Sequence, residues 1–150
     1  MAQLEIRKGP DAERSVGGLR LVACRREVGD IDGGATLYVW GREPQSESEV
    51  EILRMDLFRT RPHYHAPADR QEETQIEAVD AAAWGIEALT TRARSLASEA
   101  GYDAIGDALD LEALREAGPL LEDLLSSLEE PNEVSYFELP QSVLDGLRAE

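Results

Sequence analysis

Residues 35–59 read ATLYVWGREPQSESEVEILRMDLFR, and this stretch decides the fold. Two runs rich in β-branched, aromatic and aliphatic residues, 35–41 and 50–59, flank the polar segment REPQSESE. The first run is apolar on both parities, which is typical of a central strand. The second run alternates Leu53, Met55 and Leu57 with Val50, Ile52 and Phe58. A connection this short favours antiparallel neighbours.

Further strands are predicted on both sides of this pair. The segment GLRLVACRREV (18–28) is rich in β-forming residues, and GDIDGG (29–34) is a turn signal. LEIRK (4–8) and TQIEAV (74–79) can each add an edge strand. The first 80 residues are therefore predicted to form an antiparallel meander of three to five strands.

The second half of the chain has helical periodicity. Asp80 is a candidate N-cap and Gly101 a candidate C-cap, and between them apolar residues recur at spacings of three and four. These residues are Ala82, Ile86, Leu89, Ala93, Leu96 and Ala100. A second helix is expected from Asp110 to the break at Gly118–Pro119, and a third from Pro119 to Pro131.

The end of the chain, EVSYFELP followed by PQSVLDGLR, predicts a short strand and a final helical turn or two. Strands first and helices afterwards indicate an α+β fold: an antiparallel meander with two to four helices packed on one face. A length of 150 residues fits one domain, 1–150.

Charge is large and unevenly distributed. The net charge is −16; residues 1–70 hold 11 Lys and Arg against 12 Asp and Glu, and residues 71–150 hold 4 against 19. This balance argues against binding to nucleic acid, whose phosphates attract cations. The start of the chain has no apolar leader, and no stretch approaches the length of a membrane span. A cytoplasmic protein that does not bind membranes is expected.

Both histidines lie in the segment RPHYHAP (61–67). Prolines on either side favour an extended backbone, so His63 and His65 should point to one face and Tyr64 to the other. Two imidazoles on one face form half of a site for a divalent transition metal ion, the cofactor such a site would hold. The candidates for a third ligand are Asp56, Asp69, Glu72 and Glu73.

Other interpretations of the histidines remain open. The imidazoles can instead hydrogen-bond to backbone or carboxylate groups and fix a loop, or act in acid–base catalysis. Nearby arginines can bind an anion or pair with the acidic helices. The candidate ligand-binding residues are Arg54, Asp56, Arg59, Arg61 and Tyr64, with Tyr64 also expected as an anchor in the sheet–helix core.

Common catalytic signatures are missing: no phosphate-binding glycine loop, no H-E-x-x-H and no G-x-S-x-G occurs. Cys24 is the only cysteine, so no intrachain disulfide can form. A single cysteine in a predicted strand is interpreted as a small buried apolar residue.

The residues LRMDLFRTRPHYH, preceded by LYVWG, resemble a signature in a family of small uncharacterised bacterial proteins. The pattern is Arg-x-Asp-x-Phe followed by Pro-His-Tyr-His, and the resemblance covers residues 35–67. It implies an α+β fold and no particular chemistry. A fainter likeness is to a strand of certain toxins of toxin–antitoxin pairs, whose basic character this chain lacks.

Two functions follow from the sequence. The first is an accessory or interaction protein that self-associates or binds a partner with a basic surface, because the leucine-rich segment 120–128 and the acidic half offer contact surfaces. The second is a metal- or anion-binding domain, with or without enzymatic activity, centred on His63 and His65.

Overall fold

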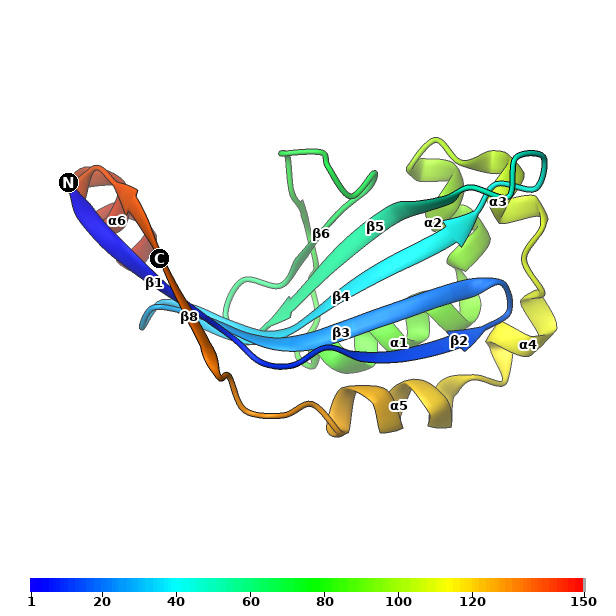
Figure 1. Cartoon of the computed structure of the whole chain (residues 1–150), viewed down its shortest axis with the longest axis horizontal. Helices are drawn as coiled ribbons and strands as arrows, with labels where there is room; N and C mark the ends of the chain where they lie inside the picture. The colour runs from blue at the N-terminus through cyan, green and yellow to red at the C-terminus, as the bar shows by residue number, and fades with distance from the viewer. Residues whose placement is uncertain (150) are drawn as a thin grey trace.

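The computed structural model describes residues 1–149 and confirms the α+β fold. One antiparallel sheet is ordered β7-β6-β5-β4-β3-β1-β8, and β2 pairs with the first half of β3 beside β1 (Figure 1). The strands are β1 (Ala2–Lys8), β2 (Ala12–Val16), β3 (Leu19–Val28), β4 (Asp32–Arg42), β5 (Glu49–Phe58), β6 (His63–His65), β7 (Thr74–Gln75) and β8 (Glu133–Leu139). The helices are α1 (Ala81–Thr91), α2 (Ala93–Glu99), α3 (Asp103–Asp107), α4 (Leu111–Arg115), α5 (Gly118–Ser126) and α6 (Gln141–Arg148).

The central strand pair lies where residues 35–59 predict it. β4 is central, and β5 returns antiparallel to it after a loop closed by a hydrogen bond from Glu43 N to Ser48 O. A bulge opposite Val39 and Trp40 lets both Ile52 and Leu53 turn inward and become buried.

The meander has seven strands in the first 80 residues, more than the three to five expected. The additional strand β2 is joined to β3 by Gly17 and Gly18, which both have positive φ angles of 62° and 95°. Two such residues form the tight hairpin turn that matches strand twist. The Gly-Gly dipeptide was the sequence signal for β2. LEIRK is also not at the edge, because the C-terminal strand β8 pairs with β1.

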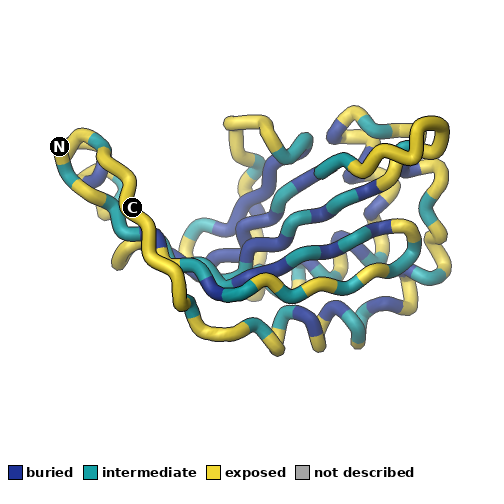
Figure 2. Tube along the Cα trace, in the orientation of Figure 1, coloured by how far each residue is buried: buried dark blue, intermediate teal, exposed yellow. Residues whose placement is uncertain are grey.

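The two faces of the sheet differ. Ala23, Leu37, Met55 and Tyr64 face one another across four strands and form the core with α1–α5, which cover this helix face. Figure 1 shows the strands in front of α1 and α2, and Figure 2 shows the buried centre shared by the sheet and these helices. The opposite face carries the alternate residues of each strand, and we call it the site face.

The helix expected over 80–100 is two helices, α1 and α2, divided at Arg92. Asp80 caps α1 by accepting from Ala83 N, as predicted. Near the break, the hydroxyls of Thr90 and Thr91 donate to the carbonyls of Ile86 and Glu87, a competition with the backbone ladder that bends helices.

The leucines of the segment 120–128, most of which is α5, do not form a free apolar surface. Leu121 and Leu124 are buried, and Leu120, Leu125 and Leu128 pack against the core. This removes the leucine-rich helix as a reason to expect self-association. No helix in residues 1–149 has the length and apolar character needed to cross a membrane.

Candidate functional site

Three side chains with metal-ligating atoms meet on the site face, between two adjacent strands. Asp56 of β5 faces His63 of β6, and His65 lies two residues further along β6. One ligand atom of each residue lies within 4.8 Å of the others. All three residues are buried, with relative exposures of 2% for Asp56, 8% for His63 and 5% for His65. The two histidines share a face because side chains alternate along an extended strand.

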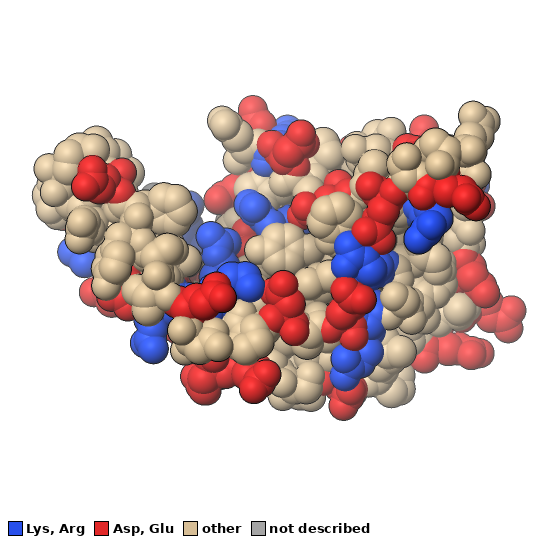
Figure 3. Space-filling view, in the orientation of Figure 1, with Lys and Arg blue, Asp and Glu red and all other residues tan. Residues whose placement is uncertain are grey.

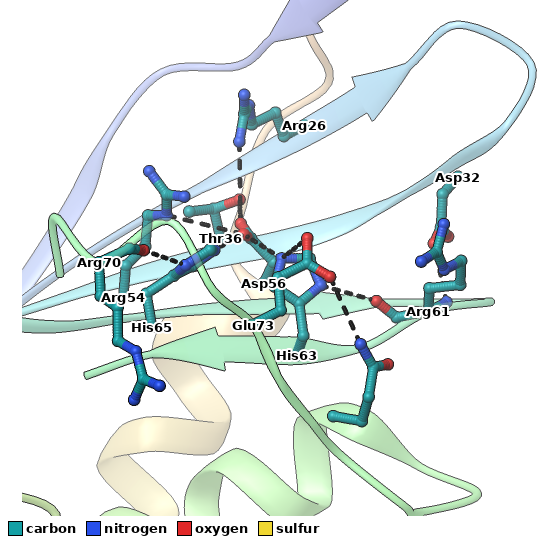
Figure 4. Close-up of polar contacts among 11 residues, drawn as sticks. Arg26, Asp32, Thr36, Arg54, Asp56, Arg61, His63, His65, Arg70 and Glu73 are labelled. Atoms are coloured by element: carbon teal, nitrogen blue, oxygen red, sulfur yellow. Dashed lines mark hydrogen bonds and ion pairs between the residues drawn. The ribbon is translucent and has the colours of Figure 1, made fainter. Parts of the chain in front are cut away.

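Backbone carbonyls fix the orientation of both imidazoles. His63 Nδ1 lies 2.9 Å from the carbonyl oxygen of Arg61, and His65 Nδ1 lies 2.7 Å from that of Arg70. A carbonyl can only accept, so each Nδ1 carries the proton and donates it. The Nε2 atoms therefore face Asp56 Oδ2, at 2.9 Å for His63 and 3.8 Å for His65. Figure 4 shows this convergence.

Asp56 is held as a carboxylate from several sides. The hydroxyl of Thr36, which faces Asp56 from β4, donates to Oδ1 over 2.8 Å. Arg26 Nη1 and Arg54 Nε lie 3.8 Å and 3.6 Å from the carboxylate oxygens (Figure 4). Burial by itself raises the pKa of Asp56, but the hydrogen bonds from His63 and Thr36 and the charge of Arg54 leave that pKa below its usual value.

His63 is shifted in the opposite direction. Burial lowers its pKa, but the hydrogen bonds to Asp56 and to the Arg61 carbonyl, with the nearby carboxylates, raise it above the usual value overall. Glu73 contributes to this field, because its Oε1 lies 3.4 Å from His63 Nε2. When its imidazole is protonated, His63 donates a hydrogen bond from Nε2 to Oδ2 of Asp56.

A turn before β6 sets the position of the histidines. The buried carboxylate of Asp32 accepts hydrogen bonds from the backbone N–H groups of Gly33, Thr60 and Arg61, at 2.8, 3.0 and 2.8 Å. Asp32 therefore fixes the turn from which Pro62 enters β6. The sequence marked Asp32 only as part of a turn signal.

The structure brings some predicted residues to the site and not others. Of the four candidate third ligands, Asp56 is in the cluster and Glu73 borders it, whereas Asp69 and Glu72 are exposed outside it. Arg54 lies beside Asp56, but Arg59 pairs with Glu27. Arg61 contributes its carbonyl to His63.

Tyr64 points away from the site, as its anchoring role requires. Its ring stacks on Trp84 of α1 with centroids 5.6 Å apart, and its hydroxyl donates to Glu99 of α2. The same side chain therefore cannot join a ligand held at Asp56 on the site face. Sequence reasoning missed Thr36 and Arg26 at the site, because only the strand register places them next to Asp56.

Three arginines near the site have ion-pair partners outside the acidic helices. The ion-pair partners of Arg54, Arg59 and Arg70 are Asp56, Glu27 and Glu72, none of which is in a helix. Other arginines make that link: Arg14 pairs with Asp123 of α5. Figure 3 shows basic side chains gathered on the exposed sheet surface, interspersed with acidic ones.

Two imidazoles and one carboxylate form a donor set that suits Zn²⁺, Fe²⁺, Co²⁺, Ni²⁺ and Mn²⁺. Without a metal ion, the same Asp56–His63 pair can hold and transfer a proton. Both uses depend on the Nδ1–carbonyl hydrogen bonds, which keep the Nε2 atoms aimed at Asp56.

Comparison with known proteins places the chain in a family. No curated protein and no solved structure matches it. One family model matches residues 12–124, which include every residue of the site. The chain belongs to the family described as "Domain of unknown function (DUF7700)".

Proposed function

We propose that the protein binds one divalent transition metal ion through Asp56, His63 and His65. The observation that carries this proposal is the pair of hydrogen bonds from the two Nδ1 atoms to backbone carbonyls. Metal-binding histidines almost always donate the other ring N–H to such an acceptor, because this fixes the tautomer and the ring orientation. Here the protein holds both rings in that state, with the remaining nitrogens directed at one carboxylate.

Thr36 extends this support to the third ligand. Its hydroxyl donates to Oδ1 of Asp56, while Oδ2 faces both imidazoles. One carboxylate oxygen is thus bonded to the protein and the other is directed at the proposed metal position. Glu73 is close enough to His63 to add a fourth ligand. A metal ion here would displace the proton that His63 shares with Asp56.

The positive charge of two arginines beside Asp56 favours an anion at the site. Arg26 and Arg54 flank Asp56, and neither guanidinium donates a hydrogen bond to a described residue. Two cations oppose the binding of a dication unless an anion accompanies it. The proposed centre therefore binds its metal together with an anionic co-ligand that accepts from these guanidinium groups.

A second candidate rests on the same arginines. Nε of Arg54 is buried and has no hydrogen-bond partner among the described residues, and His63 is readily protonated. An oxyanion such as phosphate or a carboxylate could bind to Arg26, Arg54 and His63 without any metal. The two candidates differ in one measurable respect, which is whether anion binding requires the metal ion.

The test uses full-length protein purified without a histidine tag. Elemental analysis, then titration of chelator-treated protein with Zn²⁺ and Co²⁺, should give one equivalent per chain. His63→Ala and His65→Ala should remove this binding while circular dichroism remains that of the folded protein. Tyr64→Phe is the matched control, because it lies on the same strand but faces the core. Phosphate titration with and without Zn²⁺ separates the two candidates.

One combination of results would contradict the metal proposal. If folded wild-type protein binds no metal, and both alanine variants unfold, the histidines serve to fix the loop and the metal proposal is wrong. We also propose that the residues from Arg54 to His65 are a signature of the family. An alignment of family members in which Asp56, His63 and His65 vary freely would contradict this.

A further inference from the structure

The strand β8 is an exposed sheet edge. It pairs with β1 on one side only, and six of its seven residues are exposed. Three of them are large apolar residues: Val134, Tyr136 and Phe137 have relative exposures of 51%, 59% and 56%. Figure 1 shows that β1 and β8 extend away from the rest of the molecule, and Figure 2 shows β8 as exposed along its length.

Sheet edges are usually protected against pairing with another chain. The common devices are a central charge, a proline, a bulge or a very short strand. β8 has little of this protection: its central residues 134–137 read VSYF, it contains no proline, and its register with β1 is continuous over seven pairs. Its two charged residues, Glu133 and Glu138, lie at and near the ends of the strand. Such an edge offers unpaired backbone N–H and C=O groups together with a β-forming sequence.

We propose that two copies of the chain associate through antiparallel pairing of their β8 strands, about a two-fold axis at Tyr136. Tyr136 then faces Tyr136 of the second copy, Ser135 faces Phe137, and Val134 faces Glu138. The contact is self-complementary, as a two-fold interface must be, and it joins the two sheets into one. It uses the sheet edge opposite β7, so it leaves the metal site free.

The register supports this axis on one face of the ribbon. Phe137 lies beside Leu4 of β1, and the small Ser135 lies beside Ile6. In the dimer, Phe137 of one copy therefore packs over Ser135 of the other, against its Ile6. A large side chain thus faces a small one on both sides of the axis. Leu4 and Phe137 of one copy then form a continuous apolar row with Ile6 of the other copy.

Charge supports the same register on the other face. Arg7 of β1 lies beside Val134, and its ion pair with Glu5 spans 3.8 Å. With the axis at Tyr136, Glu138 of the second copy stands next to Val134 and can reach across it to Arg7. Neither acid of β8, Glu133 or Glu138, faces another acid. A shift that moved the axis away from Tyr136 would lose this arrangement.

The net charge of −16 on each chain acts against the dimer. Added salt screens this repulsion, so dimerisation through an apolar strand should become stronger with sodium chloride. Binding of a basic partner by the acidic half would weaken under the same conditions. The effect of salt therefore distinguishes a dimer of two copies, which salt strengthens, from a complex with a basic partner, which salt weakens.

Sedimentation velocity of the full-length chain at about 1–100 µM covers the affinity expected for an interface of this small size. We expect a concentration-dependent dimer and no larger species. Tyr136→Lys should weaken it by tenfold or more, because the two lysines would face each other. Val79→Lys is the control, since Val79 is also an exposed apolar residue but lies far from β8 in the chain. A monomer throughout this range, or a dimer unchanged by Tyr136→Lys, would overturn the proposal.

Cross-linking tests the register itself. In a Cys24→Ala background, Tyr136→Cys should form an intermolecular disulfide under oxidised glutathione, because facing Cα atoms in antiparallel strands are about 4.5–5.5 Å apart. Val134→Cys should not, since equivalent residues two positions from the axis are roughly 13 Å apart. Val134→Cys combined with Glu138→Cys should cross-link again. Equal cross-linking of the two single variants would exclude this axis, and circular dichroism confirms that each variant is folded.

Discussion

His63 Nε2 lies 2.9 Å from Asp56 Oδ2, across a pair of strands in which the two residues face each other directly. Each partner shifts the pKa of the other: that of Asp56 is lowered and that of His63 is raised. The contact therefore couples protonation and stability at the place in the sheet where we propose that a metal ion binds.

The pH dependence of stability follows from these two directions. The raised pKa of His63 contributes stability that is complete below its unfolded value, about 6.5, and that is lost as pH rises through the folded value. The lowered pKa of Asp56 contributes stability that is present above its unfolded value, about 3.9, and that is lost as pH falls through the folded value. The pair thus stabilises the metal-free protein most between about pH 4 and 6.5.

Thermal melts of metal-free protein should show this window when they are compared with melts of Asp56→Asn. The difference in stability between wild type and variant should be largest inside the window and should shrink towards pH 9. Zinc should reverse the alkaline trend, because the metal ion competes with the proton on His63. A difference that does not change with pH would show that the two side chains are not coupled.

Tyr64 should be a stability residue and not a binding residue. Its ring stacks on Trp84, and its hydroxyl donates to Glu99, so Tyr64→Ala should lower the free energy of unfolding by about 2–4 kcal/mol. Tyr64→Phe keeps the stack and should cost about 1 kcal/mol. Chemical denaturation measures both. If Tyr64→Ala melted like the wild type, the anchor described for β6 would be wrong.

Local sequence patterns were sufficient for the fold class and for the faces of β6. The central pair from residues 35–59, the N-cap at Asp80 and the terminal strand all lie where their patterns predict. Period-two alternation also put His63 and His65 together, with Tyr64 opposite. These features depend on neighbouring residues, and sequence spacing contains that information.

Features that depend on distant residues could not be predicted. Thr36 and Arg26 reach Asp56 only because of the register of β3, β4 and β5, which no local pattern defines. The same applies to the pairing of β8 with β1, which joins the two ends of the chain. Arg59 is a candidate ligand-binding residue by its place in the sequence, but the turn fixed by Asp32 separates it from β6, and Arg59 pairs with Glu27.

Asp32 should control both the turn and the site. Asp32→Ala leaves three backbone N–H groups without their acceptor, which should cost about 1–3 kcal/mol of stability. It should also weaken zinc binding, because the Arg61 carbonyl that orients His63 belongs to this turn. Asp30→Asn is the control: Asp30 is a nearby acid whose ion pair, with Arg148, lies at the surface. Equal effects of the two substitutions would argue against a specific role for Asp32.

Substitution of Thr36 tests whether a residue that only orients a metal ligand can be told apart from the ligand itself. Thr36→Val keeps the buried shape but removes the hydroxyl that donates to Asp56 over 2.8 Å. Loss of a hydrogen bond to a charged group should cost about 1.5–3 kcal/mol in the metal-free protein. The carboxylate would also be less firmly oriented, and such outer contacts change metal affinity by about 10–100-fold.

Isothermal titration calorimetry should therefore show that Thr36→Val binds zinc at one site with lower affinity than the wild type. His63→Ala should show no zinc binding. Thr36→Ser restores the hydroxyl and should recover most of the affinity, even though it loses a buried methyl group and some stability. Recovery with serine links the effect to the hydrogen bond, because packing alone would make serine worse than valine. If valine and serine bind zinc equally well, Thr36 does not orient Asp56, and the carboxylate is held by His63 and the two arginines alone.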